Sequence, residues 1–137
     1  MWRLLLSALV LAGCVQLPPS PQDIQAKKFE SLPDKAVIYI VRSKVDSVFG
    51  GTLWLGDRAQ ITTYAGTYYR WEVTPGSHRI AAYAPSNASV TVQTSAGRVY
   101  FVQHTVFGDL RAGPLVSFLE QIHERDGRVL VAQAQLL

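Results

Sequence analysis

The sequence holds one cysteine, Cys14, and three histidines in 137 residues. A lone thiol excludes an intramolecular disulfide and any cysteine-cluster metal site. Charged residues are also scarce, at 17% of the chain, with 13 Lys plus Arg against 10 Asp plus Glu. A net charge of +3 is too small and too scattered to neutralise a run of nucleic acid phosphates. The fold is therefore expected to depend on apolar packing alone.

Hydrophobic residues make up 48% of the chain, which is enough for the core of one domain. The longest apolar run, Leu4 to Gly13, follows a single positive charge at Arg3. A helix of that length rises about 15 Å, half of the hydrocarbon thickness of about 30 Å. The segment is therefore predicted to be a secretory signal peptide, residues 1–13, rather than a membrane span.

The end of this run, Leu11-Ala12-Gly13-Cys14, resembles the bacterial lipobox, in which the thiol is acylated and the chain is cut just before it. The alternative is that Cys14 is an ordinary buried thiol at the end of a core strand. The order of charge, apolar run, small residues and cysteine favours lipidation of Cys14. Resemblance to the sorting rule of such lipoproteins implies the periplasmic face of the outer membrane, because Val15 rather than aspartate follows the cysteine.

Three prolines in the segment Val15 to Pro21 predict an extended tether. Ser20 is suited to cap a helix, Pro21 to begin it, and Asp23 to interact with the positive end of its dipole. We therefore predict a short helix from Pro21 to Phe29 within a lipidated tether of residues 14–33. Residues 34–137 are predicted to form the globular domain.

From Ala36 onward the apolar pattern has a period of two, which is typical of β-structure. The stretch Ala36 to Arg42 is apolar on both faces and predicts a central strand. Further strands are predicted at 52–55, 59–63, 68–73, 78–84, 90–93 and 98–106. Turns are predicted at 56–58, where a hairpin closes, at 74–77, where a type II turn brings the next strand back antiparallel, and at 85–87. These strands predict an all-β meander or Greek key.

The stretch from Leu115 to Ile122 is ambiguous, because its apolar residues fit a helix as well as a strand. Gly127 accordingly marks either a helix stop or a turn. Periodicity alone leaves both alternatives open.

Four segments resemble one bacterial family, the lipoproteins of domain-of-unknown-function family 2846. They are Ala26-Lys27-Lys28-Phe29, Ala36 to Arg42, Val73-Thr74-Pro75-Gly76-Ser77-His78, and Ala96 to Val102. The ordered match covers nearly all of the chain after the leader. The resemblance implies an antiparallel β-sandwich, transthyretin- or immunoglobulin-like, with short N-terminal and C-terminal helices. It also implies a strand at 115–122 and a helix near 125–134, and it brings no established activity.

Residues suited to catalysis are few. None of the histidines, His78, His104 and His123, has a cysteine or another histidine at ligand spacing, and Ser77 falls in a predicted turn rather than a nucleophile elbow. We therefore expect no enzyme activity, no metal and no cofactor, and treat a hydrolase as the least favoured alternative.

Aromatic residues are concentrated in the middle of the chain. Trp54, Tyr69 and Trp71 are expected in the core. Tyr64, Tyr68 and Arg70 are the candidate binding surface. The predicted function is a non-catalytic, lipid-anchored module that binds an envelope protein or assembly, with a glycan such as peptidoglycan as the alternative ligand.

Overall fold

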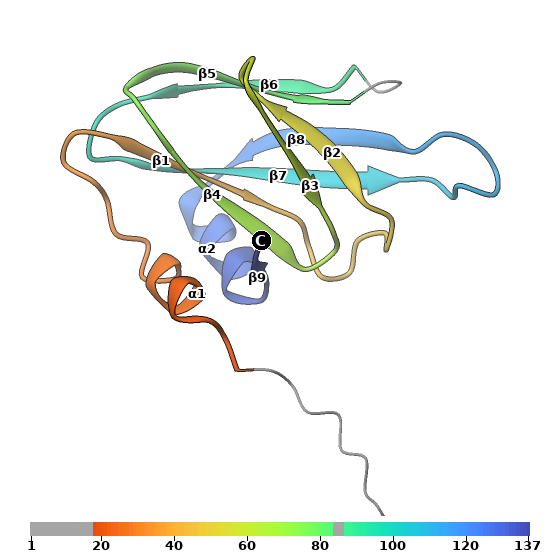
Figure 1. The fold of residues 1–137 in the computed structure, drawn as a ribbon, viewed down its shortest axis with the longest axis horizontal. Helices are drawn as coiled ribbons and strands as arrows, with labels where there is room; N and C mark the ends of the chain where they lie inside the picture. Colours follow the sequence, from red (N-terminus) through yellow and green to blue (C-terminus); the bar gives the residue numbers. More distant parts are fainter. Residues whose placement is uncertain (1–17, 84–86) are drawn as a thin grey trace, which may run out of the picture.

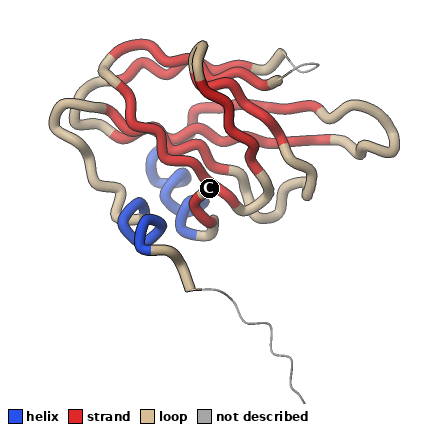
Figure 2. The backbone as a smooth tube through the Cα atoms, in the orientation of Figure 1, coloured by secondary structure: helices blue, strands red, loops and turns tan. Residues whose placement is uncertain are grey.

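The computed structural model describes residues 18–83 and 87–137, so the predicted leader, Cys14 and most of the turn at 85–87 lie outside the described residues. The described chain is mostly β-structure, arranged as two facing sheets with helices on one side (Figure 1, Figure 2). This confirms a two-layer, sandwich-like β fold. Within these residues no helix is long and apolar enough to cross a membrane.

One sheet has five strands in the order β8-β7-β1-β4-β9 and the other has four in the order β3-β2-β5-β6. The five-stranded sheet contains β1 (Ala36–Val41), β4 (Thr67–Val73), β7 (Val99–Phe107), β8 (Val116–Ile122) and β9 (Gln135–Leu136). The four-stranded sheet contains β2 (Gly51–Leu55), β3 (Ala59–Thr63), β5 (Gly76–Ala82) and β6 (Ser89–Thr94). The helices are α1 (Pro21–Ala26) and α2 (Glu124–Ala132).

The central strand β1 is buried on both faces, as predicted. Its residues Ile38 and Ile40 point between the sheets, where they pack with Leu53, Ile80 and other apolar side chains. The intervening residues point to the outer face, where Tyr39 packs in a second core beneath the two helices. The apolar run of β1 therefore follows from its position between two separate cores.

The sheets are not purely antiparallel, so that part of the predicted fold class was wrong. β1 pairs with β7 in parallel, and the short strand β9 pairs with β4 in parallel. The predicted return of the chain after 74–77 also differs, because β4 and β5 belong to different sheets and form no hairpin. Alternation of apolar and polar residues is a local pattern within one strand. The pairing of β1 with β7 joins strands that are distant in sequence, so alternation does not reveal it.

The predicted strands and the hairpin of β2 with β3 are confirmed. The two helices are also confirmed, with small differences at their ends. The Ser20 hydroxyl accepts a hydrogen bond from the Asp23 amide, and Pro21 begins α1. The helix ends at Ala26 instead of Phe29, whose φ of 54° lies in the left-handed region. The strand at 116–122 and the helix α2 resolve the ambiguity of the C-terminal stretch, and β9 was not predicted. Both alternatives for Gly127, a helix stop or a turn, were wrong, because Gly127 lies inside α2.

Candidate functional site

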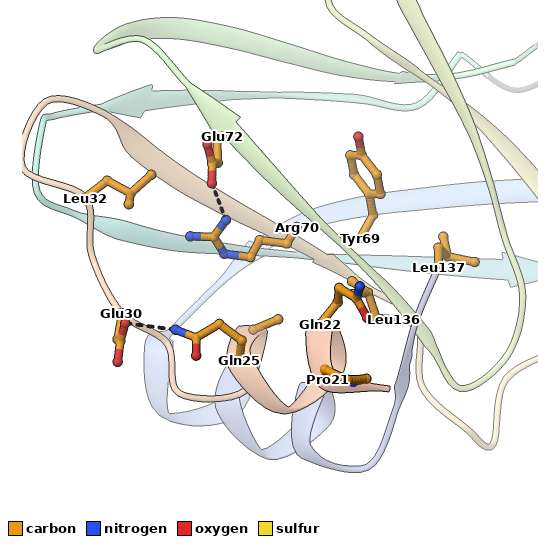
Figure 3. A pocket seen from close by; sticks show the side chains of 11 residues that line it. Pro21, Gln22, Gln25, Glu30, Leu32, Tyr69, Arg70, Glu72, Leu136 and Leu137 are labelled. Carbon is orange, nitrogen blue, oxygen red and sulfur yellow. Dashed lines mark hydrogen bonds and ion pairs between the residues drawn. The ribbon is translucent and has the colours of Figure 1, made fainter. Parts of the chain in front are cut away.

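A groove with a volume of about 660 Å³ lies between α1 and β4 (Figure 3). The helix and the loop after it contribute Gln22, Gln25 and Leu32. Across from them, β4 contributes Tyr69, Arg70 and Glu72, and Leu136 and Leu137 line the groove as well. The lining therefore combines apolar side chains with a few polar groups, which is typical of binding sites.

Asp23 holds the helical wall of this groove in place. Its carboxylate accepts hydrogen bonds from the Tyr68 hydroxyl at 2.7 Å and from the Leu136 amide at 3.1 Å. The other carboxylate oxygen lies 3.0 Å from the Lys27 ammonium. Burial alone raises the pKa of Asp23, but the bonds from Tyr68, Lys27 and Leu136 outweigh it and lower the pKa overall. One buried carboxylate thus joins α1 to β4 and β9.

Charges of opposite sign line the β4 side of the groove. The Arg70 guanidinium donates to the Glu72 carboxylate at 2.6 Å, and both side chains are partly exposed. On the helix side, the Gln25 amide donates to Glu30 at 3.0 Å (Figure 3). Burial lowers the pKa of Arg70, but its interactions with Glu72 and Tyr39 outweigh this effect and raise the pKa overall.

The three predicted surface residues do not form one surface. Tyr64 is 49% exposed in the loop between β3 and β4, as expected. The prediction that Tyr68 is exposed was wrong, because its side chain is completely buried and bonded to Asp23. The polar face of β4, which alternation identified, is covered near Tyr68 by α1. Arg70 lies on that same face but lines the groove.

The aromatic residues expected in the core divide in the same way. Tyr69 and Trp71 are half-buried and pack against the core between the sheets, as predicted. Trp54 is 37% exposed, so its prediction as a core residue was wrong. It alternates with the buried Leu53 and Leu55 and therefore lies on the outer face of the four-stranded sheet.

His104 forms a polar bridge inside the sandwich. Its Nδ1 lies 2.8 Å from the Thr63 hydroxyl and its Nε2 lies 2.9 Å from the Ser117 hydroxyl. Burial and the nearby Arg42 charge lower the pKa of His104 to about 4, and Asp46 opposes this. A side chain at Gly51 would collide with the imidazole, whose Cε1 lies 2.6 Å from an added Cβ. The neutral imidazole thus connects the two sheets.

Arg42 and Asp46 form a second polar cluster beside this bridge. The Arg42 Nε lies 2.7 Å from the Asp46 carboxylate, and the guanidinium also donates to the carbonyls of Thr63 and Ser47. Asp46 in turn accepts from the Val106 amide. Each nitrogen of the buried guanidinium donates a hydrogen bond, two of them to the loop residues Asp46 and Ser47 and one to Thr63 of β3, which is a structural role.

No protein-family model matches the chain, and no curated protein matches its sequence. Within the described residues, no cluster of histidines, cysteines and carboxylates suited to a metal ion is found.

Sequence reasoning missed Asp23 and the helical side of the groove. The signals that predicted α1, Ser20, Pro21 and Asp23, were local to the helix. The contact of Asp23 with Leu136 joins residues 113 positions apart. Such contacts leave no mark in the local pattern of a single sequence, although an acidic residue in a short, otherwise uncharged helix was the available hint.

Proposed function

We propose that this protein is a lipid-anchored bacterial lipoprotein that binds a protein partner of the cell envelope through the groove between α1 and β4. Acylation of Cys14 would hold it at the periplasmic face of the outer membrane. The observation that carries the proposal is the place of the groove. Its helical wall begins at Pro21, and the six residues from Val15 to Ser20 reach at most about 20 Å. The groove therefore stays near the membrane surface.

We also propose that the chain belongs to the lipoprotein family that it resembles, domain-of-unknown-function family 2846. The finer fold class that we propose is a transthyretin- or immunoglobulin-like sandwich. Two facing sheets of five and four strands support this class, although it must accommodate the parallel pairs of β1 with β7 and of β4 with β9. Short helices near both ends of the described chain also agree with what the resemblance implies.

We also propose that the protein is not an enzyme. The residues nearest to a catalytic arrangement are His104 and Ser117, whose atoms lie 2.9 Å apart. A pKa of about 4 makes the imidazole a weak base at neutral pH. Its other nitrogen bonds the Thr63 hydroxyl instead of a carboxylate, so the imidazolium formed during catalysis would lack a counter-charge there.

The experiment places a photo-crosslinking amino acid at Gln22, in the full-length chain in intact cells. We expect a discrete protein adduct in the membrane fraction. The substitution Leu32→Asp, which places a charge on the apolar part of the groove, is expected to reduce that adduct about tenfold. The matched control carries the crosslinker at Thr91, an exposed residue of β6 outside the groove lining.

Absence of an adduct from Gln22, or equal adducts from Gln22 and Thr91, contradicts binding in the groove. Circular dichroism of Leu32→Asp establishes that the variant is folded. If the adduct persists unchanged in a folded Leu32→Asp variant, the partner contacts some other surface.

A further inference from the structure

We propose that the partner in the groove is a second copy of this chain. In this arrangement the two copies join along β4, so that their five-stranded sheets form one continuous sheet across a two-fold axis. The inference rests on the proposed function and names the partner at the same site. It depends on the main-chain edge of β4, on the charges beside that edge and on the geometry of the face that carries α1.

The main chain of β4 offers an open edge at the groove. β9 pairs with β4 only at Thr67 and Tyr68, and no other strand of the described residues pairs on that side. The Leu137 amide donates to the Tyr68 carbonyl, so even-numbered residues of β4 direct their main-chain groups away from β1. The main-chain groups of Arg70 and Glu72 therefore face the open edge.

The charges of β4 select one register for a second copy. Antiparallel pairing centred on Trp71 sets Arg70 opposite Glu72 of the other copy, twice. Both pairs exchange main-chain hydrogen bonds, because these residues face the edge. Centring the axis on Arg70 or Glu72 instead sets like charges opposite each other, which is unfavourable. The strand is therefore self-complementary in one arrangement.

The other edge strands lack this pattern. β3 and β6, which border the four-stranded sheet, carry no charged side chain, and β8 carries only Glu120. β8 also packs against β5 and β6, which partly closes that side of the sandwich. The open part of β4 is thus the edge among the described strands that presents both signs of charge.

The ends of β4 fit such a pair. In this register Tyr68 would lie opposite Thr74 of the other copy. The chain leaves the sheet after Val73 to begin β5 in the opposite layer, as Figure 1 shows. The chain of the second copy therefore turns away from the first copy at the point where Leu136 and Leu137 of the first copy begin to cover the edge of β4. The Arg70 and Glu72 side chains of the second copy would enter the groove.

The same two-fold axis is compatible with anchorage of both copies in one membrane. Neighbouring antiparallel strands are related by an axis perpendicular to their sheet, so both copies keep α1 on the same face. Both tethers then leave toward one side. A contact of about five residues along one strand is small for a stable dimer in solution. Confinement of two anchored copies to a membrane raises their effective concentration.

Charge reversal tests the pairing. Two differently tagged full-length copies are co-expressed, each with the photo-crosslinker at Gln22, and the membrane fraction is analysed. Wild-type copies are expected to give an adduct of two chains. Arg70→Glu on both copies, or Glu72→Arg on both copies, is expected to reduce it about tenfold, because like charges then oppose each other.

The decisive sample combines Arg70→Glu on one copy with Glu72→Arg on the other, which restores opposite charges at both positions and is expected to restore the adduct. The control reverses the exposed pair on α2 in the same way, with Arg128→Glu and Glu124→Arg, and is expected to leave the adduct unchanged. An adduct with a different protein, or failure of the combined variants to recover, overturns self-pairing while binding in the groove stands. Absence of every adduct contradicts both proposals.

Discussion

At the scale of the residue, Asp23 connects three elements through one carboxylate. It is 4% exposed, and its hydrogen bonds reach the Tyr68 hydroxyl and the Leu136 amide. Removal of one side chain from a buried hydrogen-bonded cluster leaves its partners unsatisfied. The resulting loss of stability exceeds the net contribution of the hydrogen bonds themselves. The position of α1, and with it the groove, therefore depends on this side chain.

We predict that Asp23→Ala lowers the free energy of unfolding by about 2 to 4 kcal/mol. The measurement is denaturant unfolding followed by circular dichroism. Glu124→Ala, which removes a carboxylate from an exposed ion pair with Arg128, is the control and is expected to cost less than about 1 kcal/mol. Equal effects of the two substitutions would show that the Asp23 contacts contribute little.

His104 gives a prediction about pH. Burial and Arg42 lower the pKa of His104 from 6.5 to about 4 in the folded state. Between these two pH values the imidazole is protonated in the unfolded chain but neutral in the folded chain. Stability therefore falls as the pH falls from about 6.5 to about 4, and this contribution stops changing below that range. Over the whole range the loss attributable to His104 is about 3 kcal/mol.

The measurement is the free energy of unfolding between pH 7 and pH 5, where carboxylates contribute least. His104→Gln keeps hydrogen-bonding groups toward Thr63 and Ser117 but cannot titrate. We expect its stability to change less with pH than that of the wild type. Parallel pH profiles for the two proteins would contradict a neutral, buried His104.

At the scale of the element, α2 depends on the absence of a side chain at Gly127. A Cβ there would overlap the Phe101 ring, so the helix lies as close to β7 as its main chain allows. Glycine is a poor residue for a helix interior, and alanine normally stabilises by about 1 kcal/mol. Here the close contact with Phe101 reverses the expected sign.

We predict that Gly127→Ala destabilises the protein by about 2 kcal/mol despite its better helix propensity. Thermal unfolding measures the effect. Val129→Ala on the same helix is the control, because Val129 is 54% exposed and its truncation is expected to change stability by less than about 0.5 kcal/mol. A stabilised Gly127→Ala protein would mean that α2 can move away from Phe101.

The elements also show which parts of the fold a sequence can predict. The burial of β1 on both faces follows from its unbroken apolar run, and the hairpin of β2 with β3 follows from a short turn between two strands. Both signals are local. The parallel pairing of β1 with β7 and the burial of Tyr68 beneath α1 depend on which distant segments meet. Alternation on β4 identified the face of Tyr68 correctly but not what covers it.

At the scale of the whole molecule, the proposed function joins three features: the predicted leader of residues 1–13, the predicted lipidation of Cys14, and the groove whose helical wall begins at Pro21. Two or three acyl chains suffice for stable anchoring, because each buried CH₂ contributes about 0.8 kcal/mol. Loss of the acyl chains is therefore expected to release the protein from the membrane while the sandwich, whose cores lie in the described residues, stays folded.

The most direct measurement is the intact mass of the mature protein extracted from membranes, with fragmentation of its N-terminal peptide. We predict a chain that begins at Cys14 and carries diacylglyceryl and acyl groups on that residue. We further predict that Cys14→Ser yields a chain without these groups and without cleavage at that bond. A wild-type chain that begins elsewhere, or an unmodified Cys14, would contradict the account.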